Sequence, residues 1–446
     1  MVIQKKIFFS PVVCAGITVA LLLYSGTITP VNPHAFYSLI SPEKITCISG
    51  SVTSNPIKTS SGRFYSIFFD TDKVLSHNTA SSAQGRVQLL IATEIVEALY
   101  PGKLYTKLQS VVGDSFNAPV IEQGAVAVAH VQFLSYGDDS VHAYPLYIVD
   151  SITQNGWKNS VSHIRAIFRT EFKRLLYAWG NAGGLLLALL SGSREYTDET
   201  VSEAFKNAGL SHVLALSGMH LSLFSGLALG LGKLLGGKKV GLYFSFCAVI
   251  VFVWFAGLSP SLFRALLCTL ISMVLSACFL PGISTEPQIF FRFITPSFSS
   301  IRLIRIISLA FLIHVCLFLP DVFSLAFMLS YGALMGIAIA DCTINPILAK
   351  ILPPYLASAF SASLGAQLCT APIIFHFFGM LMPVGIIASV IVTPITLGFL
   401  IIGIICIVIS AFIPGFLYAL GDVMQGIYFL LERIVLWFAK FPPIEF

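Results

Sequence analysis

The chain has 446 residues, of which 56% are hydrophobic and 11% are charged, and its mean hydropathy is +0.86. A soluble domain carries roughly a quarter charged residues, so this composition excludes an ordinary soluble protein and indicates a polytopic membrane protein. The formal net charge of +5 permits an anionic partner without requiring one, because the cytoplasmic loops of membrane proteins are rich in Lys and Arg.

A transmembrane helix is predicted for residues 1–30. Lys5 and Lys6 precede an apolar run from Ile7 to Tyr24, and no small-x-small cleavage site follows the run. We therefore expect an uncleaved membrane anchor rather than a cleaved signal peptide. Its basic end is expected in the cytoplasm, because Lys and Arg are retained on that side.

The more polar stretch 44–150 predicts a separate β domain. Within it, short alternating runs are separated by Gly, Asn, Asp and Ser, which is typical of strands joined by turns. About a hundred residues can bury the core of one small barrel or sandwich. The domain is expected outside the cytoplasm, because the preceding helix would carry the chain outwards. The alternating runs are 64–69, 86–92, 103–108 and 125–134.

The stretch 160–206 opens with an amphipathic helix that is rich in cations. Residues 164–179 repeat apolar side chains at helical spacing and place four basic side chains among them. Two interpretations remain: a helix that lies on lipid head groups, or a basic surface that collects nucleic-acid phosphates. An outside location would run against the usual preference of Lys and Arg for the cytoplasm, which favours a functional role. The four cations are Arg165, Arg169, Lys173 and Arg174.

A second apolar run, 183–190, is too short to span a membrane, so a re-entrant segment is expected. Thr197 or Asp198 is expected to cap a short helix that continues through Lys206. Gly209 suits the end of that helix, because glycine readily adopts the left-handed conformation found at helix ends.

The remaining residues, 207–446, predict a transmembrane domain of about eight helices. The run 384–412 contains Pro394 and fits either one kinked helix or two short ones. The basic loops fall on the cytoplasmic side if the first helix runs from inside to outside, which supports this orientation. These loops contain Lys233, Lys238, Lys239, Arg292, Arg302, Arg305 and Lys350. The predicted spans are 212–235, 240–258, 261–280, 303–319, 321–343, 355–378, 384–412 and 415–438.

Polar residues stand in and just before the first of these spans. Ser211, His212, Ser217 and His220 lie in an otherwise apolar stretch, and polar groups at membrane depth usually face a cavity or another helix. Packing against neighbouring helices and a polar stripe along a pore both remain open. An intramembrane serine protease is a distant alternative, because Ser217 and His220 on one helical turn have poor geometry for nucleophilic catalysis.

Further polar groups and helix breaks mark the later spans. Arg264 follows Pro260 by four residues, which places it about 6 Å into a helix. Its guanidinium either reaches back to the interface or faces a lumen, where it can bind phosphate oxygens in a bidentate manner. Gln367 and Pro372 lie together in another span. Because broken helices at membrane depth are tolerated where they face protein or water, a transport cavity is indicated.

The sequence shows no motif of a familiar catalytic centre. It has no glycine-rich loop ending in Gly-Lys-Ser or Gly-Lys-Thr, and no His-x-His-x-Asp-His cluster. The nine cysteines have no metal-ligand spacing, and all but Cys47 lie in apolar segments. We therefore expect no catalytic residues, no metal site and no cofactor.

Several sequence blocks stand in a fixed order across residues 180–410. They are Leu185–Ser191 followed by Glu203-Ala204-Phe205 and Gly209; Ser211-His212-x-Leu214-x-x-Ser217-Gly218-x-His220; Gly257-x-Ser259-Pro260-Ser261-x-x-Arg264-Ala265; Phe327-x-Leu329-Ser330-Tyr331 with Gly336; and Ser361-x-Ser363-x-x-Ala366-Gln367-x-x-x-x-Pro372 with His376-Phe377. Together they resemble the ComEC-type competence proteins, the bacterial membrane channels for incoming transforming DNA. Two positions depart from that family: Met328 replaces the usual Gln, and Ser389 replaces the usual Asn.

The resemblance implies a channel component that carries single-stranded DNA across the bacterial cytoplasmic membrane, with an OB-like β domain near its N-terminus. It also implies a DNA receptor outside the membrane and an ATP-driven motor inside, and a homo-oligomer is a further expectation. Many family members continue into a β-lactamase-like nuclease domain. No such domain is expected in this chain, so strand degradation would require a separate nuclease or the β domain.

A hydrated path is the physical requirement for such a channel, because phosphates cannot enter hydrocarbon. Cations, backbone N–H groups at broken helix ends and aromatic faces are suited to line it. A small-molecule secondary transporter is the main rival, because broken helices and buried polar groups are typical of transporters too. The residues expected to border the path are Ser211, His212, Ser217, Gly218, His220, Pro260, Arg264, Gln367 and Pro372.

Overall fold

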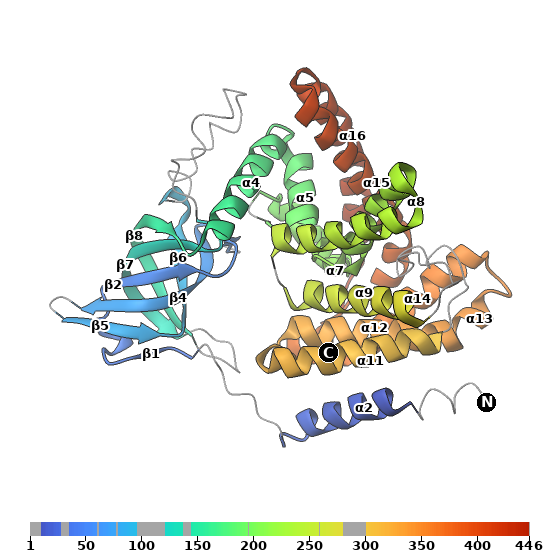
Figure 1. Ribbon diagram of the computed structural model, residues 1–446, viewed down its shortest axis with the longest axis horizontal. Helices are drawn as coiled ribbons and strands as arrows, with labels where there is room; N and C mark the ends of the chain where they lie inside the picture. The colour runs from blue at the N-terminus through green and yellow to red at the C-terminus, as the bar shows by residue number, and fades with distance from the viewer. Residues whose placement is uncertain are drawn as a thin grey trace.

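The computed structural model places a β domain beside a larger helical domain, with α4 (Ser160–Tyr177) between them (Figure 1). It describes residues 10–27, 35–59, 62–76, 79–95, 121–136, 144–194, 196–257, 259–279 and 300–445. Within the predicted anchor the structure forms α2 (Pro11–Tyr24), an apolar helix of 14 residues that is shorter than the membrane-spanning helices below, and the two lysines lie outside the described residues. Val13 of α2 belongs to an apolar cluster that also contains Ile304 and Ile307 of α11 (Ser300–Leu317).

The β domain is built from strands whose alternating sequence buries one face. Ile67, Phe69, Leu89 and Ile91 are fully buried, and their immediate neighbours along the strands are half-buried. Successive side chains of a strand point to opposite faces, which explains this alternation. The predicted run 103–108 lies outside the described residues. The strands are β1 (Tyr37–Ser38), β2 (Cys47–Val52), β3 (Ile57–Lys58), β4 (Phe64–Ser76), β5 (Thr79–Gln84), β6 (Arg86–Ala92), β7 (Ala125–Tyr136) and β8 (Pro145–Trp157).

Strand pairing in the β domain returns to its starting strand. β2 pairs with β4, β4 with β6, β6 with β8, β8 with β7, and β7 again with β2. The β6–β8 pair is parallel and the other four are antiparallel. Each of these five strands therefore has a partner on both sides, which leaves its backbone groups paired.

The helical domain contains the remaining helices, and α8, α9, α11 and α12 run roughly side by side while α5 and α16 cross them steeply (Figure 1). Among the residues that the structure describes, four helices are long and apolar enough to cross a membrane: α8, α12, α14 and α15. The helices are α5 (Gly180–Ser191), α6 (Glu199–Asn207), α7 (Ser211–Leu214), α8 (Gly218–Ala256), α9 (Pro260–Phe279), α11, α12 (Leu325–Thr343), α13 (Asn345–Leu348), α14 (Pro354–Phe378), α15 (Gly385–Phe412) and α16 (Leu417–Phe438), with the short η3 (Leu319–Phe323) before α12.

Helix α8 is a hairpin of two antiparallel arms. Its backbone leaves helical geometry at Gly236 and Gly237, where Gly237 has φ +80°, a conformation that suits glycine. The hydroxyls of Ser225 and Ser245 then meet across the hairpin at 2.6 Å. Each arm has roughly 18 residues and rises about 27 Å, close to the thickness of a hydrocarbon core. The arms correspond to the predicted spans 212–235 and 240–258.

The run with two open interpretations, 384–412, forms one helix. α15 continues from Gly385 to Phe412 with Pro394 inside it, and α14 likewise continues through Pro372. Proline within a helix removes one backbone hydrogen bond, which membrane helices tolerate when neighbouring groups compensate. After α14 comes the short strand β9 (Met380–Leu381). It pairs with β10 (Ile444–Glu445), which follows α16.

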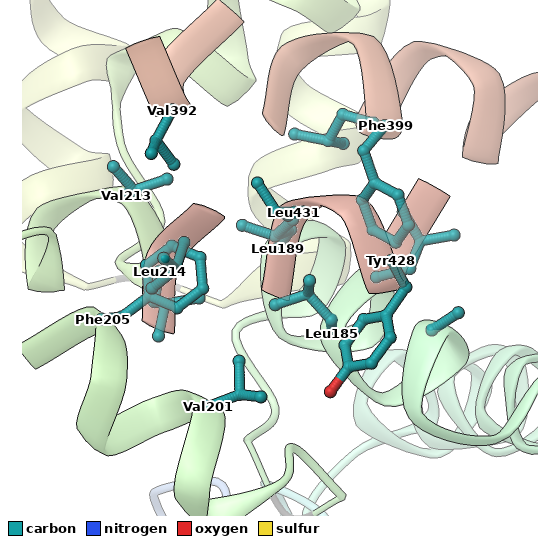
Figure 2. Close-up of a cluster of buried hydrophobic side chains, with 14 of the residues drawn as sticks. Leu185, Leu189, Val201, Phe205, Val213, Leu214, Val392, Phe399, Tyr428 and Leu431 are labelled. Carbon is teal, nitrogen blue, oxygen red and sulfur yellow. The ribbon is translucent and has the colours of Figure 1, made fainter. Parts of the chain in front are cut away.

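The short apolar run 183–190 forms the centre of the largest apolar core (Figure 2). It lies in α5, where Leu185 and Leu189 are almost completely buried. Phe399 of α15 and Tyr428 of α16 belong to the same cluster. Trp179, just before α5, donates its indole N–H to the backbone carbonyl of Leu417 at 2.8 Å. A helix covered on all sides needs an apolar surface all round, which explains why this run looked like a membrane segment.

Candidate functional site

The approach to the Ser-His segment is a helix with a defined beginning and end. The Asp198 side chain accepts a hydrogen bond from the Thr200 N–H at 3.0 Å and caps α6. Gly209 follows the helix at φ +70°. Its backbone packs against the start of α15, since a Cβ on Gly209 would lie 3.1 Å from the Cα of Gly385. The predicted cap and stop are both confirmed.

The observed membrane helix begins later than the predicted span 212–235. Ser211 to Leu214 form the separate one-turn helix α7, and Ala215 and Ser217 then adopt extended backbone conformations. The membrane hairpin therefore begins at Gly218, and the two histidines lie on different elements. His212 is exposed on α7, whereas His220 is completely buried in the first turn of α8.

Ser217 and His220 together cap α8. The Ser217 hydroxyl accepts from the Met219 N–H at 3.3 Å, and the Nδ1 atom of His220 accepts from the Ser217 N–H at 3.2 Å. The first N–H groups of a helix have no partner within it, so these contacts satisfy them reciprocally. Ser217 thus stands before the helix rather than on one of its faces. The three-residue spacing is accounted for by capping, and the Nε2 atom of His220 is buried without a hydrogen bond.

Arg264 lies inside the helical domain rather than at a surface. It donates to the backbone carbonyl of Ser330 on α12, and its guanidinium lies over the ring of Tyr331 at 5.8 Å. The side chain is 7% exposed, and its Nε atom has no hydrogen-bond partner. Among the residues that the structure describes, no carboxylate lies within ion-pair distance of this cation. A buried guanidinium without a counter-charge is costly, so it is a candidate site for an anion.

The sequence blocks meet in two neighbourhoods. At the first, Gly218 of α8 lies beside Ala265 of α9, since a Cβ on Gly218 would be 3.6 Å from the Cβ of Ala265. The Ser330 hydroxyl also donates to that of Ser261 at 3.2 Å, which joins α12 to the start of α9. Pro260 begins α9 and is half-buried. This neighbourhood therefore contains the Ser-Gly, Ser-Pro-Ser and Leu-Ser-Tyr blocks.

The second neighbourhood surrounds Gln367 of α14. Its side-chain amide donates to the backbone carbonyl of Met382 at 3.4 Å, and a Cβ on Gly385 would collide with the same amide. Because Gly385 also touches Gly209, Gln367 lies close to the turn before the Ser-His segment. Pro372 is exposed one and a half turns further along α14. The segment from residue 209 to residue 218 thus connects the two neighbourhoods.

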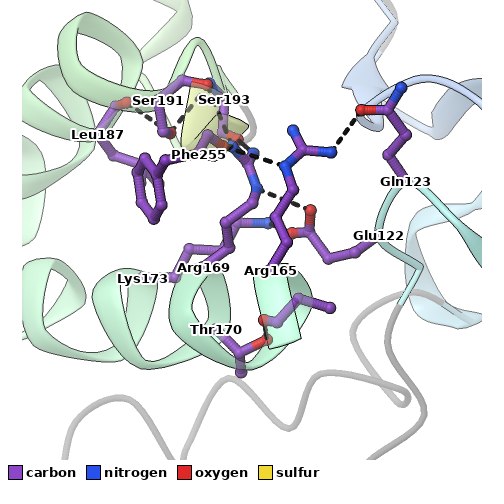
Figure 3. Close-up of polar contacts among 11 residues, drawn as sticks. Glu122, Gln123, Arg165, Arg169, Thr170, Lys173, Leu187, Ser191, Ser193 and Phe255 are labelled. Atoms are coloured by element: carbon purple, nitrogen blue, oxygen red, sulfur yellow. Dashed lines mark hydrogen bonds and ion pairs between the residues drawn. The ribbon is translucent and has the colours of Figure 1, made fainter. Parts of the chain in front are cut away.

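Glu122 organises a buried charge cluster at the junction between the β domain and the helices (Figure 3). Arg169 of α4 donates to one carboxylate oxygen of Glu122 at 2.9 Å, and Lys173 contacts the other oxygen. Arg169 also donates to the backbone carbonyl of Phe255 at 2.9 Å and to the Ser193 hydroxyl at 2.5 Å. The cluster therefore connects the β domain, α4, the residues after α5 and the end of α8.

Arg165 belongs to the same cluster. It donates to the Gln123 side chain at 2.5 Å and to the Phe255 carbonyl at 3.2 Å. The expectation of an exposed basic surface is therefore wrong for Arg165, Arg169 and Lys173, because the β domain and α8 cover them. The fourth predicted cation, Arg174, is half-buried and pairs with Glu171 at 3.2 Å.

The outward face of α4 is apolar instead of basic. Val161, Ile164 and Phe168 are exposed, and Phe168 meets Trp254 of α8 edge to face at 6.2 Å. The helix is amphipathic as predicted, but its charged face points inwards. An exposed apolar face that continues onto a membrane hairpin is suited to lipid contact.

Opposing effects act on the ionisation of the buried cluster. Burial alone would raise the pKa of the Glu122 carboxyl, but the three neighbouring cations outweigh burial and lower this pKa to about 2. Burial and the charge of Arg169 lower the pKa of Arg165 to about 10, against the attraction of Glu122. One carboxylate thus serves three cations, and its loss would leave all of them buried without a counter-charge.

Sequence reasoning missed Glu122 and Gln123 as partners of α4. A signal was present in the spacing of Arg165, Arg169 and Lys173, which are four residues apart and so share one face of a helix. Three cations on one face favour an acidic partner, but the carboxylate that satisfies them lies 47 residues before Arg169. Spacing along one helix cannot identify a partner at that distance.

A family model described as "Competence protein" matches residues 189–446, more than half of the chain. The chain belongs to this competence family. The match covers the Ser-His segment, the Arg264 neighbourhood and the Gln367 neighbourhood, while the β domain and α4 precede it. Membership confirms the resemblance seen in the sequence blocks and supports a role in competence-related DNA uptake. No curated protein and no solved structure matches the chain.

Proposed function

We propose that this competence protein is a membrane channel component that carries single-stranded DNA across the bacterial cytoplasmic membrane during natural transformation. The observation that carries the proposal is family membership across residues 189–446. It is supported by apolar helices of membrane-spanning length in the same region. A strand of DNA carries one negative charge per nucleotide, so it requires a route through those helices that is neither dry nor anionic.

The route that we propose follows the segment between the two neighbourhoods described above. Ser211 and His212 are exposed on this segment, which begins close to Gln367 and ends at Gly218 beside Ala265, the residue that follows Arg264. The guanidinium of Arg264 has an Nε–H without a hydrogen-bond partner. No carboxylate of the described residues lies within ion-pair distance of this guanidinium. Such a group can bind the two oxygens of a phosphodiester, and the Ser330 carbonyl that now holds it is a weaker partner than a phosphate. His220 and Pro372 would border the route without touching DNA in this conformation.

We further infer that the β domain is OB-like, extracytoplasmic and the part that first meets DNA. Its cyclic strand order with one parallel pair supports a small OB-like barrel, a fold that binds oligonucleotides on its outer face. On the outer side of β4, Phe68 lies 5.7 Å from Tyr144, and the guanidinium of Arg86 lies over the Phe68 ring at 5.9 Å. Half-buried aromatic rings beside a cation suit the stacking of bases. This surface replaces α4 as the proposed DNA-collecting surface.

The proposed orientation places the β domain outside and the lysine-rich tip of α8 inside. Lys233, Lys238 and Lys239 stand at that tip. Phe255, whose carbonyl contacts Arg169 of α4, lies at the opposite end of the hairpin. Lysine-rich loops favour the cytoplasm. The N-terminus would then be cytoplasmic. An extracytoplasmic DNA receptor, a cytoplasmic ATP-driven motor, a separate nuclease and a homo-oligomeric assembly are the partners that the family implies.

Substitution of Arg264 tests the proposed route. In a transformable host that relies on this protein, Arg264→Gln is expected to reduce internalised labelled DNA and transformant numbers by about tenfold or more, because a charged hydrogen bond to phosphate contributes roughly 1.5–3 kcal/mol. Arg305→Gln, which removes an exposed arginine of α11, is the matched control and should retain uptake. Protein levels in the membrane are measured by immunoblot.

Two outcomes would count against these proposals. Normal uptake by Arg264→Gln at normal protein levels would remove Arg264 from the route. Normal transformation in a strain without the protein, together with the loss of uptake of a small solute, would favour a secondary transporter instead.

A further inference from the structure

Arg194 stands in the short connection between α5 and α6, which the structure describes at residues 192–194 and 196–198. Its side chain is exposed, and its guanidinium makes no hydrogen bond or ion pair with the described part of the chain. Burial nevertheless lowers the pKa of Arg194, because the surrounding protein removes part of its hydration. A side chain that solvent reaches, but that loses hydration to its neighbours, lies in a recess rather than on a convex surface.

The first part of this connection packs against the Ser-His segment. Gly192 ends α5 with φ +73°, and a Cβ added there would lie 2.9 Å from the side chain of Leu216. Leu216 directly precedes Ser217, which caps α8. Arg194 therefore follows closely on a contact with the end of the proposed route.

The same connection reaches the β domain through two neighbours of Arg194. Ser193 accepts a hydrogen bond from Arg169 at 2.5 Å, as Figure 3 shows. The ring of Tyr196 meets that of Tyr177 edge to face at 3.7 Å. Tyr177, the last residue of α4, packs against both the core of the β domain and the core around α5. Arg194 therefore lies between the β domain and the Ser-His segment.

The charges next to this connection increase its attraction for an anion. Arg165 and Arg169 both face the carboxylate of Glu122, and the Nη2 atom of Arg165 is buried without a hydrogen-bond partner. Two guanidiniums that share one carboxylate leave a positive field, and salt screens buried charges little. That field adds to the charge of Arg194 and favours a phosphate group in the recess.

The backbone around Arg194 is held in place before any ligand binds. The Arg194 carbonyl accepts a hydrogen bond from the Thr197 N–H at 3.3 Å, and Asp198 caps α6 directly afterwards. On the other side, the Ser193 N–H donates to the Ser191 hydroxyl at 3.3 Å. A fixed backbone restricts the positions open to the guanidinium, which reduces the cost of ordering it on a ligand.

We propose that Arg194 binds a phosphodiester group of the incoming single strand at the outer entrance of the route, between the β domain and the Ser-His segment. This inference rests on the proposed function, because it takes DNA as the cargo. The guanidinium donates two N–H groups to two phosphate oxygens, the geometry in which arginine binds phosphate most strongly. The strand passes from the surface around Phe68 to Arg194 and then to Arg264.

DNA binding by the purified full-length protein tests the inference. The protein is placed in nanodiscs of zwitterionic phosphatidylcholine, and binding of a fluorescent oligothymidylate is followed by anisotropy at several salt concentrations. Arg194→Gln should weaken binding about tenfold, because it removes one charged contact with phosphate. The slope of log affinity against log salt concentration should become shallower by about 0.7, the value for one phosphate of a single strand.

Two further variants separate charge from structure. Arg194→Lys keeps the charge, so it should keep the wild-type salt slope and weaken binding by less than Arg194→Gln. Arg305→Gln, which removes the exposed arginine of α11, is the matched control and should change neither affinity nor slope. The thermal midpoint of Arg194→Gln should equal that of the wild type. A lower midpoint would identify Arg194 as a structural residue and overturn the inference.

Other outcomes would also decide against it. Unchanged affinity and salt slope in Arg194→Gln overturn the inference while the proposed function stands. Unchanged DNA binding, together with loss of the thermal stabilisation that phosphatidylglycerol gives to the wild type, would assign Arg194 to a lipid phosphate instead. Failure of the proposed function looks different, because the wild type would then bind no strand and a strain without the protein would take up DNA normally.

Discussion

At the scale of single residues, three buried cations share the carboxylate of Glu122. Arg165, Arg169 and Lys173 are each almost completely covered, and Glu122 is 1% exposed. Water cannot reorganise around such charges, so each relies on fixed partners. The Phe255 carbonyl and the Gln123 side chain supply neutral partners, but the only carboxylate in the described cluster is Glu122. The attachment of the β domain therefore depends strongly on this residue.

Replacing Glu122 by glutamine should destabilise the protein. The amide leaves the cations uncompensated, and breaking a buried ion pair in this way costs roughly 3–5 kcal/mol. We expect a large drop in the midpoint of thermal unfolding of the detergent-solubilised protein. Asp70→Asn is the matched control, since its pair with Arg86 is partly exposed at 3.2 Å and should contribute roughly 1 kcal/mol or less. Equal effects of the two changes would contradict the importance of the buried cluster.

Acid should weaken the same attachment. The pKa of Glu122 is about 2 in the folded protein and about 4.3 in an unfolded chain, so its folded pKa is depressed. A depressed carboxyl pKa contributes stability that is present above the unfolded pKa and is lost as pH falls through the folded one. Stability of the wild type should therefore decrease between about pH 4 and pH 2 more steeply than that of Glu122→Gln. Parallel pH profiles for the two proteins would contradict the lowered pKa.

At the scale of elements, α12 and α14 pack with their backbones almost in contact. A Cβ on Gly365 of α14 would collide with the backbone carbonyl of Gly336 on α12, and the Ser361 hydroxyl donates to the Ala340 carbonyl at 3.0 Å. Small residues that allow close approach are a common basis of helix association in membranes. The contact matters for the site because α12 carries Tyr331 and α14 carries Gln367.

One added methyl group tests this contact. Gly365→Ala should lower the thermal midpoint and the DNA uptake of the protein, because overpacking forces the two helices apart at a cost of about 1–3 kcal/mol. Gly398→Ala adds the same methyl group on α15, where no heavy atom lies within 4 Å, and should be neutral. Unchanged stability in Gly365→Ala would mean that α12 and α14 can separate without cost.

The helix α4 has the two faces that its sequence predicts, but the charged face is the buried one. Its apolar residues Val161, Ile164 and Phe168 face outwards, while Arg165 and Arg169 face the protein. The sequence spacing defines two faces but not which face is buried. The carboxylate of Glu122 decides this, since the cations follow their counter-charge.

At the scale of the whole molecule, the proposed orientation has a direct test. In a variant that lacks the native cysteines, Ala80→Cys in β5 should react with a membrane-impermeant maleimide added to intact spheroplasts. Lys238→Cys at the tip of α8 should react only after the membrane is permeabilised, because lysine-rich loops favour the cytoplasm. Both positions are exposed. Ala80 lies in β5, and Lys238 lies at the tip of the α8 hairpin. The opposite labelling pattern would invert the proposed topology.

Much of the fold was predictable from the sequence, and the site was predictable only in part. The alternation in β4 and β6, the α6 cap at Asp198 and the stop at Gly209 each depend on neighbours in sequence, and each is present. The positions of Arg264 and Gln367 beside the Ser-His segment depend on helix packing. No local pattern could show that His220 is buried while His212 is exposed, because different helices surround them.

The sequence by itself determined that this protein is a membrane protein of the competence family with a β domain between its first helix and the others. Hydropathy and strand alternation are local properties, and a chain in lipid must satisfy its backbone within helices, so these features were readable without coordinates. Only the tertiary structure decided that the cations of α4 are buried, that α8 is a hairpin and that Arg264 lies against Ser330 and Tyr331 of α12. Those outcomes depend on contacts between residues far apart in the chain, where geometry rather than spacing selects the partners.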